Sequence, residues 1–162
     1  MKDAEFDSYV AARSRRLLGV ATMLVGPHDA EDALQDAFIT LYRRWDRVVA
    51  AENPDAYVHR SLVNASLQLL RRRRRIELPP TFGLTGHDDV ISDRQEMLQA
   101  LASLPPRQRA VLVLAFYEDR SEAEIAAAMG SSRGTVKSQK ARALNALRTR
   151  LRSDDDERTC TP

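Results

Sequence analysis

One segment near the middle of the chain limits what this sequence can fold into. Residues 76–92 read IELPPTFGLTGHDDVIS and contain two adjacent prolines and two glycines. A helix does not continue through such a segment, and it shows none of the alternation of a half-buried strand. The segment therefore predicts a linker. Each flanking part of the 162-residue chain has at most about 80 residues, so each would be marginal if it folded alone.

The charges follow the same division. The net charge is +3 over residues 1–75, −4 over 76–93, +6 over 94–152 and −3 over 153–162. We predict a first domain at 1–75, a flexible linker at 76–93, a second domain at 94–152 and an acidic tail at 153–162. Two basic domains favour a nucleic-acid partner, although a solvated charged surface would have the same composition.

The composition excludes several classes of protein. Cys160 is the only cysteine and the three histidines are scattered, so we expect no disulfide framework and no metal site. No phosphate-binding loop, nucleophile elbow or paired acid and base is present, so we expect neither an enzyme nor a cofactor. No apolar run approaches a membrane span and the N-terminus has no signal peptide, which predicts a cytoplasmic protein.

The first domain is predicted to contain three helices. The first ends at Gly26-Pro27, and the second carries apolar residues at helical spacing from Ala30 to Trp45. Trp45 is expected in the core, and the acidic residues of the second helix are expected on its opposite side: Asp29, Asp32 and Asp36.

The third helix begins at Asn53-Pro54, a cap followed by proline in the first turn, and runs into the five arginines Arg71 to Arg75. Six polar side chains lie beside its apolar stripe: Tyr57, His59, Arg60, Asn64, Ser66 and Gln68. The aromatic and amide side chains among them could contact unpaired bases. A place for Tyr57 in the core is equally compatible with the spacing. The arginines would neutralise phosphates or simply solubilise the helix end.

The second domain is also predicted to be helical, which makes the whole chain all-α. Ser92 and Pro105-Pro106 begin the first two helices, and Ser121 to Glu124 form a capping box. Gly130 ends that short helix, and Ser131 or Ser132 begins a long one with seven basic and no acidic residues between 131 and 152. This order is typical of a DNA-binding helix-turn-helix; the alternative is a charged helix that faces water.

Several of these segments resemble bacterial sigma factors of the sigma-70 family. Residues 29–38 (DAEDALQDAF) resemble the segment that binds core RNA polymerase. Residues 104–111 (LPPRQRAV) resemble the opening of region 4, and residues 121–126 and 134–138 resemble its helix-turn-helix. The two-domain layout is similar to the extracytoplasmic-function (ECF) group, which keeps only regions 2 and 4.

The resemblance implies a sigma factor that directs core RNA polymerase to specific promoters and helps to open the DNA. It implies three sets of contacts. Core polymerase would bind Asp32, Gln35 and Asp36. The −10 element would contact the loop from about Asp46 to Asn53 and Tyr57, Arg60, Asn64, Arg71 and Arg72. The −35 element would contact Arg133, Thr135, Lys137, Ser138 and Arg142. Besides core polymerase and promoter DNA, the family adds an anti-sigma factor as a candidate partner.

Two other functions are compatible with parts of the sequence. A stand-alone helix-turn-helix regulator would use the first domain as a sensor or for dimerisation. The acidic second helix and the arginine-rich third helix favour the sigma factor, because a sensor would need a ligand pocket. A nucleic-acid enzyme lacks a catalytic set.

Overall fold

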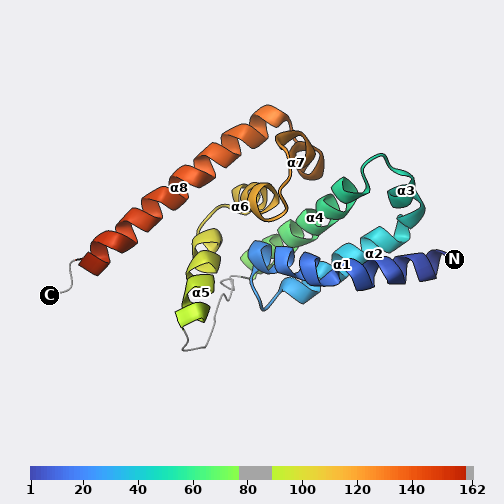
Figure 1. The fold of residues 1–162 in the computed structure, drawn as a ribbon, viewed down its shortest axis with the longest axis horizontal. Coiled ribbons are helices and arrows are strands. Elements are labelled where there is room, and N and C mark those ends of the chain that lie inside the picture. Colours follow the sequence, from blue (N-terminus) through green and yellow to red (C-terminus); the bar gives the residue numbers. More distant parts are fainter. Residues whose placement is uncertain (77–88, 160–162) are drawn as a thin grey trace.

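The computed structural model describes residues 1–76 and 89–159, and every secondary-structure element within those residues is helical (Figure 1). The first domain consists of α1 (Lys2–Val25), α2 (Ala30–Arg43), α3 (Trp45–Ala50) and α4 (Pro54–Arg75). The second consists of α5 (Asp89–Ala102), α6 (Pro106–Leu112), the π-helix η1 (Val113–Tyr117), α7 (Glu122–Met129) and α8 (Arg133–Thr159). The prediction of an all-α fold with two helical domains is confirmed. Residues 77–88 of the predicted linker lie outside the described residues.

In the first domain, α2 and α4 pack against each other and against α1. Gly26 ends α1 as predicted: its φ is 89°, which favours glycine, and its N–H donates to the carbonyl oxygen of Thr22 at 2.8 Å. Asn53 caps α4 by accepting a hydrogen bond from the N–H of Ala56 at 3.2 Å. The turn and cap signals in the sequence thus determine where α1 ends and α4 begins.

The prediction for Trp45 is right about the core and wrong about the helix. Trp45 is 5% exposed, and its ring centroid lies 5.2 Å from that of Phe6 and 5.1 Å from that of Tyr9. However, α2 ends at Arg43, and Trp45 begins the short helix α3, where a loop was predicted. This helix is anchored by only two buried side chains, Trp45 and Val48, too few for a periodicity to be visible in the sequence.

The helix-turn-helix of the second domain is confirmed. The capping box at the start of α7 is complete, with Glu124 N–H donating to Ser121 Oγ at 3.1 Å. Gly130 ends α7 with φ 61°, and Ser132 Oγ accepts from Thr135 N–H at 3.1 Å as α8 begins. The sequence predicted a start near Ser92 for α5, but this helix begins three residues earlier, at Asp89.

Between α6 and α7 the backbone adopts a conformation that the sequence did not predict. The five residues of η1 form a π-helix, in which Glu118 N–H donates to Val113 O at 3.1 Å. Asp119 follows with φ 52°, unusual for a residue other than glycine. After these turns the buried side chain of Glu118 contacts Arg16 and His59 of the first domain.

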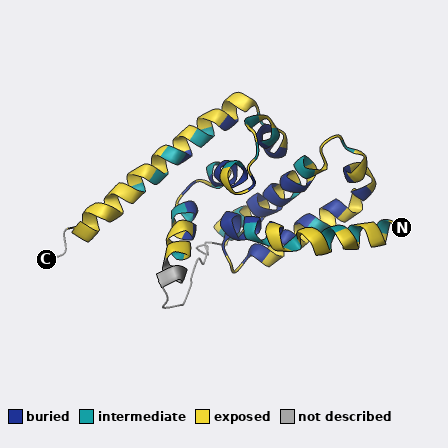
Figure 2. Cartoon of the chain, in the orientation of Figure 1, coloured by how far each residue is buried: buried dark blue, intermediate teal, exposed yellow. Residues whose placement is uncertain are grey.

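At its other end, α8 continues through the acidic residues 154–157 to Thr159. Arg158 Nη2 donates to Glu96 Oε1 of α5 at 2.6 Å. Figure 2 shows this half of α8 as almost entirely exposed. Residues 153–159 of the predicted tail are therefore part of the helix.

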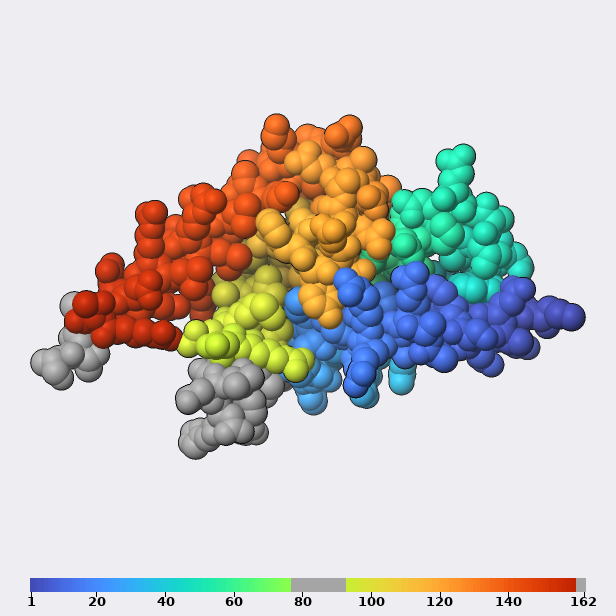
Figure 3. Space-filling view, viewed as in Figure 1, coloured from blue at the N-terminus to red at the C-terminus, as the bar shows by residue number. Residues whose placement is uncertain are grey.

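The two domains pack against each other. Helix α7 contacts α4, and α5, α6 and η1 contact α1. The space-filling view shows residues of the second domain lying directly on α1 and α4 (Figure 3). Buried apolar side chains of both domains belong to a single cluster. The sequence had made no prediction about this arrangement.

Candidate nucleic-acid and polymerase interfaces

The predicted polymerase-binding residues lie together on α2. Asp32, Gln35 and Asp36 are exposed, as their spacing of three and four residues on one helix face predicts. With Leu69 and Ile76 they line a hollow of about 480 Å³ between α2 and the end of α4. This hollow places two carboxylates and an amide where a protein partner can reach them.

The arginine-rich end of α4 lies beside these acids. Arg73 forms an ion pair with Asp29, whose side chain is only 3% exposed. Asp29 was grouped with Asp32 and Asp36 on the outer side of the helix, and this was wrong, because Asp29 stands at the N-cap position and is buried against Arg73. Arg72 Nη2 lies 3.5 Å from Asp36 Oδ2 in an exposed pair, and Arg71 is exposed.

A larger hollow of about 1110 Å³ lies between α2, α3 and α4. Residues predicted to bind the −10 element line it: Tyr57, Arg60 and Asn64 of α4, and Val48, Ala51, Glu52 and Asn53 of the predicted loop. Tyr57 is 39% exposed and is therefore not a core ring. An aromatic face, an amide and a guanidinium in one hollow can stack on, hydrogen-bond with and neutralise a single-stranded nucleic acid. Neither Arg71 nor Arg72 lines this hollow; Arg72 lines the smaller one.

Further residues line the larger hollow. Gln68 of α4 was predicted on the polar side of this helix, whereas Arg43 and Arg44, at the junction of α2 and α3, were missed. Gln68 is four residues after Asn64, so its position on the same helix face was predictable. The positions of Arg43 and Arg44 could not be predicted, because their place in the hollow depends on the turn between α2 and α3.

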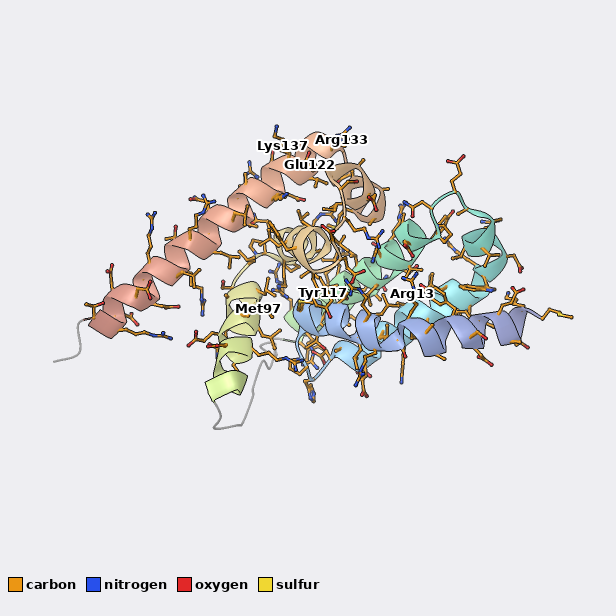
Figure 4. All side chains as sticks on the ribbon, viewed as in Figure 1. Arg13, Met97, Tyr117, Glu122, Arg133 and Lys137 are labelled. Atoms are coloured by element: carbon orange, nitrogen blue, oxygen red, sulfur yellow. The ribbon has the colours of Figure 1, made fainter. Side chains whose placement is uncertain are left out.

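The predicted −35 residues are all exposed on the first half of α8: Arg133, Thr135, Lys137, Ser138 and Arg142. Figure 4 shows Arg133 and Lys137 pointing away from the rest of the molecule. Val136 and Ala143 are fully buried and hold the opposite side of the helix against the domain. This half of α8 thus presents a basic and accessible helix face.

Not every polar side chain of this half is equally available. The Thr135 hydroxyl lies 2.9 Å from Ser132 Oγ and takes part in the helix cap. Lys140 Nζ lies 5.3 Å from the centroid of the Phe116 ring, within range of a cation–π interaction. Arg133, Lys137, Ser138 and Arg142 are the predicted −35 residues whose side chains are exposed and take no part in these two contacts.

A polar cluster between the domains was also missed. Glu118 accepts a hydrogen bond from Arg16 Nε of α1 at 2.7 Å, and its second oxygen lies 2.8 Å from His59 Nε2 of α4. Burial by itself would raise the pKa of Glu118, but hydrogen bonds and charge from His59 and Arg16 outweigh it and lower that pKa. The buried carboxylate is therefore ionised at neutral pH.

The described residues offer little for other kinds of site. Their side chains include no group of three or more His, Cys, Asp or Glu that could hold a metal ion. No helix in the two described ranges has both the length and the apolar character that a membrane crossing requires.

Comparison with known protein families identifies both domains. The family model for sigma-70 region 2 matches residues 9–76, and the model for sigma-70 region 4 matches residues 94–147. The chain belongs to the sigma-70 family. It is a sigma factor, a protein that directs RNA polymerase to promoters, and the stand-alone regulator is not favoured because the first domain matches a sigma region.

Similar proteins agree with this family. The chain is 40% identical to the RNA polymerase sigma-E factor of Streptomyces avermitilis, over 93% of this chain and 87% of the relative. It is 32% identical to the ECF sigma factor SigE of Mycolicibacterium smegmatis, over 94% of this chain and 63% of the relative. The sigma factor belongs to the ECF group, as the two-domain layout predicted.

Solved structures share the fold. The sigma factor RpoE of Bartonella quintana, in complex with the anti-sigma factor NepR, is 25% identical with a TM-score of 0.75, covering 93% of this chain and 98% of that one. CnrH, in complex with the cytosolic domain of CnrY, has a TM-score of 0.69 at 23% identity, covering 94% and 90%.

Proposed function

We propose that this sigma factor uses three separate faces: α2 for core polymerase, the larger hollow for the −10 strand and the first half of α8 for the −35 duplex. The observation that carries the proposal is the hollow of about 1110 Å³ in the region 2 domain. It combines an exposed aromatic ring, amides and arginines, which is the chemistry that an unpaired strand requires.

The polymerase face is the exposed group Asp32, Gln35 and Asp36. Asp36 has an exposed partner in Arg72 at 3.5 Å, and such pairs contribute at most about 1 kcal/mol. Exchanging this internal pair for a basic residue of the polymerase therefore costs little. Asp32 and Gln35 have free access from solvent on the same face.

The −10 face captures a base that has left the duplex. Unstacking a base costs a few kcal/mol, and stacking on an aromatic ring returns about 1–3 kcal/mol per base. Tyr57 supplies the ring, Asn64 and Gln68 supply hydrogen-bonding amides, and Arg43 and Arg44 supply charge for the backbone. The strand is therefore held only once the DNA has opened.

The −35 face reads duplex DNA with the N-terminal half of α8, as in other helix-turn-helix proteins. Lys137 and Arg142 can contact base edges or phosphates, and Ser138 can contact either. All three side chains are exposed on a helix that is anchored by Val136 and Ala143.

The proposed role makes the chain a non-enzymatic, cytoplasmic initiation factor, because the polymerase itself supplies the chemistry. An anti-sigma factor is a further candidate partner. The support is the Bartonella quintana relative, which was solved with an anti-sigma factor bound.

Run-off transcription with purified core RNA polymerase on genomic fragments tests the proposed function. We expect promoter-specific transcripts only when the protein is present, and co-purification of the protein with core polymerase. Tyr57→Ala should reduce transcription from duplex promoters more than Tyr57→Phe, because only phenylalanine keeps the stacking surface. Absence of transcripts together with sequence-specific binding to duplex DNA alone would contradict the proposal and favour a stand-alone regulator.

A further inference from the structure

The larger hollow contains one amide whose orientation is fixed by the helix beside it. Asn53 lines this hollow and stands at the N-cap position of α4. Its Oδ1 accepts a hydrogen bond from the backbone N–H of Ala56 at 3.2 Å. Because a backbone N–H can only donate, the atom that faces it is the amide oxygen and not the amide nitrogen. The cap of α4 therefore determines which way this amide points.

The cap leaves Asn53 with one kind of hydrogen bond to offer to a ligand. An asparagine side chain has an oxygen that accepts and an NH₂ group that donates. The oxygen of Asn53 is engaged by α4, and the side chain is exposed. The NH₂ group remains to meet a ligand, so Asn53 acts as a donor. Asn64 and Gln68 also line the hollow, but they lie farther along α4, where an amide can turn either its oxygen or its nitrogen outward.

Asn53 is also a close neighbour of the ring that is proposed to stack on the base. Asn53 and Tyr57 are four residues apart at the start of α4, a spacing that brings side chains together on one face of a helix. Side chains of a helix lean toward its N-terminus, so the side chain of Tyr57 leans toward the turn that begins at Asn53. A base stacked on Tyr57 exposes its hydrogen-bonding edge to the residues around the ring. Asn53 is therefore placed to read that edge.

The electrostatics at this end of α4 favour a hydrogen-bond acceptor as the ligand atom. The N-terminus of a helix carries a partial positive charge, and α4 is 22 residues long. The guanidinium groups of Arg43, Arg44 and Arg60 line the same hollow and can only donate. A carbonyl oxygen of the base is therefore favoured beside Asn53, whereas an amine would meet a second donor.

One neighbouring residue has the opposite polarity. Glu52 lines the hollow and is exposed, and an ionised carboxylate can only accept hydrogen bonds. As the reading residue, Glu52 would select an amine of the base, whereas Asn53 would select a carbonyl oxygen. The two residues thus make opposite predictions about base preference, which one experiment can separate.

We propose that Asn53 determines base specificity at the captured position of the −10 strand, where its Nδ2 donor selects thymine or guanine over cytosine or adenine. The inference rests on the proposed function, since it concerns the same hollow. Thymine O4 and guanine O6 are acceptors, whereas cytosine and adenine carry an amino group at the corresponding place. With either of the latter two bases, two donors face each other and neither makes its hydrogen bond.

Two variants change the reading atom while keeping the cap. Aspartate caps helices about as well as asparagine, so Asn53→Asp should keep the first turn of α4. Its second carboxylate oxygen replaces the NH₂ group and can only accept. Asn53→Ser also keeps a cap, but its single hydroxyl group is engaged by the helix and no second polar group remains. The first variant should reverse the base preference, and the second should remove it.

The measurement is the affinity of the complete holoenzyme, the sigma factor with core RNA polymerase, for a mapped promoter with a pre-opened −10 region. Each position of the unpaired strand carries uracil or cytosine in turn. These two bases differ in their hydrogen-bonding edge but not in the methyl group that distinguishes thymine. At one position, the wild-type holoenzyme should bind uracil about tenfold more tightly than cytosine. Asn53→Asp should prefer cytosine there, and Asn53→Ser should discriminate less than about twofold.

Asn64→Asp is the matched control in the same hollow. It introduces the same charge on the same helix, at a residue that does not cap α4. It should weaken the binding of both bases and leave their ratio unchanged. General repulsion between the new carboxylate and the strand cancels, because each comparison is a ratio within one protein. Circular dichroism and thermal unfolding check that each variant is folded, and Asn53→Ser decides the matter if Asn53→Asp does not fold.

Three results would overturn the inference: no position at which the wild type prefers uracil and Asn53→Asp prefers cytosine, a wild-type preference that survives in Asn53→Ser, or a reversal by Asn64→Asp. A wild-type preference for cytosine that Glu52→Gln removes would also overturn it and assign the reading to Glu52. Failure of the proposed function looks different. In that case the wild-type holoenzyme binds the pre-opened promoter no more tightly than single-stranded DNA of unrelated sequence, whichever base is present.

Discussion

Buried charged residues determine how the two domains meet. Arg109 is 3% exposed and donates to four carbonyl oxygens, those of Leu24, Leu101, Ala102 and Leu104. Burial lowers the pKa of Arg109 to about 10, so the guanidinium remains charged at neutral pH. In the sequence Arg109 was part of a motif that resembles region 4. Its structural role, joining the α5–α6 turn to the end of α1, is visible only in the fold.

Glu118 gives a prediction about pH. Because its pKa is lowered in the folded protein, ionised Glu118 stabilises the fold above the pKa of an unfolded glutamate, about 4.3. This contribution is lost as the pH falls through the lower, folded pKa. The difference in the free energy of unfolding between wild type and Glu118→Gln should therefore be largest near neutral pH and shrink below about pH 4.

Urea unfolding at a series of pH values measures this difference. The charged and titratable groups around Glu118 are Arg16 of α1, His59 of α4, Tyr9 of α1 and Arg120. They are common to both proteins, so the comparison isolates the carboxylate. A difference that stays constant from pH 7 to pH 3 would show that the charge of Glu118 does not stabilise the fold.

At the scale of elements, the sequence was most informative where a local rule applies. The caps at Asn53, Ser121 and Ser132 and the glycine at Gly130 each act within about four residues, so the ends they mark could be predicted. Helix α3 and the π-helix η1 are short and are held by packing between distant helices, so no local sequence pattern predicts them.

The parts of the candidate site that could be predicted from the sequence lie on a single helix. Asp32, Gln35 and Asp36 share one helix face, and so do Tyr57, Arg60 and Asn64; the periodicity of a helix is sufficient for both groups. Arg72 beside Asp36, and Arg43 with Arg44 in the larger hollow, depend on how helices cross. Such contacts cannot be derived from spacing along the chain.

Helix α2 gives a second prediction. The double variant Asp32→Lys/Asp36→Lys should lose binding to core RNA polymerase, because it replaces both acidic contacts with repulsive charges. Loss of a desolvated charge pair typically costs about 2–5 kcal/mol. Pull-down with tagged core polymerase measures binding, and circular dichroism should show unchanged helicity.

Glu31→Lys is the matched control for α2. Glu31 is exposed on the same helix but does not line the hollow with Asp32 and Asp36. Unchanged binding by the double variant, or equal loss in the control, would mean that α2 is not the polymerase face.

Helix α8 gives a third prediction. Lys137→Ala and Arg142→Ala should each weaken promoter-dependent transcription. The two positions are about 140° apart around the helix. We therefore expect one side chain to contact a base edge and the other to contact a phosphate. Loss of a base contact should cost about 1–3 kcal/mol at one promoter position. Loss of a phosphate contact should weaken all promoters alike and reduce the salt dependence of binding by about one ion.

The measurement for α8 is transcription from a mapped promoter and its single-base −35 variants. Arg148→Ala serves as the control, since Arg148 is exposed on the same helix beyond the recognition half. If Lys137→Ala and Arg142→Ala both keep wild-type activity on every promoter variant, α8 does not read the −35 element.

The arrangement of the whole molecule could not be predicted from the sequence. Glu118 and Arg16 are 102 positions apart, and Glu118 and His59 are 59 apart. Two basic domains separated by a linker would be expected to repel each other. Instead, their contact is made by an acidic side chain of the second domain with basic and polar side chains of the first, and the net charge of each domain conceals this local complementarity.

The closed arrangement yields a prediction about DNA binding by the free protein. With the domains in contact, only one promoter-reading face can engage at a time, and the net charge of the chain is only +2. The wild-type protein should therefore bind a promoter with a pre-opened −10 region no more tightly than a fragment that contains the −35 element alone. A Cβ atom added at Gly19 of α1 would lie 2.6 Å from the hydroxyl oxygen of Tyr117, so Gly19→Leu should push the second domain off α1. This variant should bind the pre-opened promoter about tenfold more tightly than the fragment, because linked sites reinforce each other once both can engage. Its binding should also weaken more steeply with salt, since more phosphates are contacted.

Fluorescence anisotropy at several salt concentrations measures both the affinity and its salt dependence. Nanomolar, sequence-specific binding of the free wild-type protein to the full duplex at physiological salt would contradict this account, because it would require both faces to read DNA while the domains remain together.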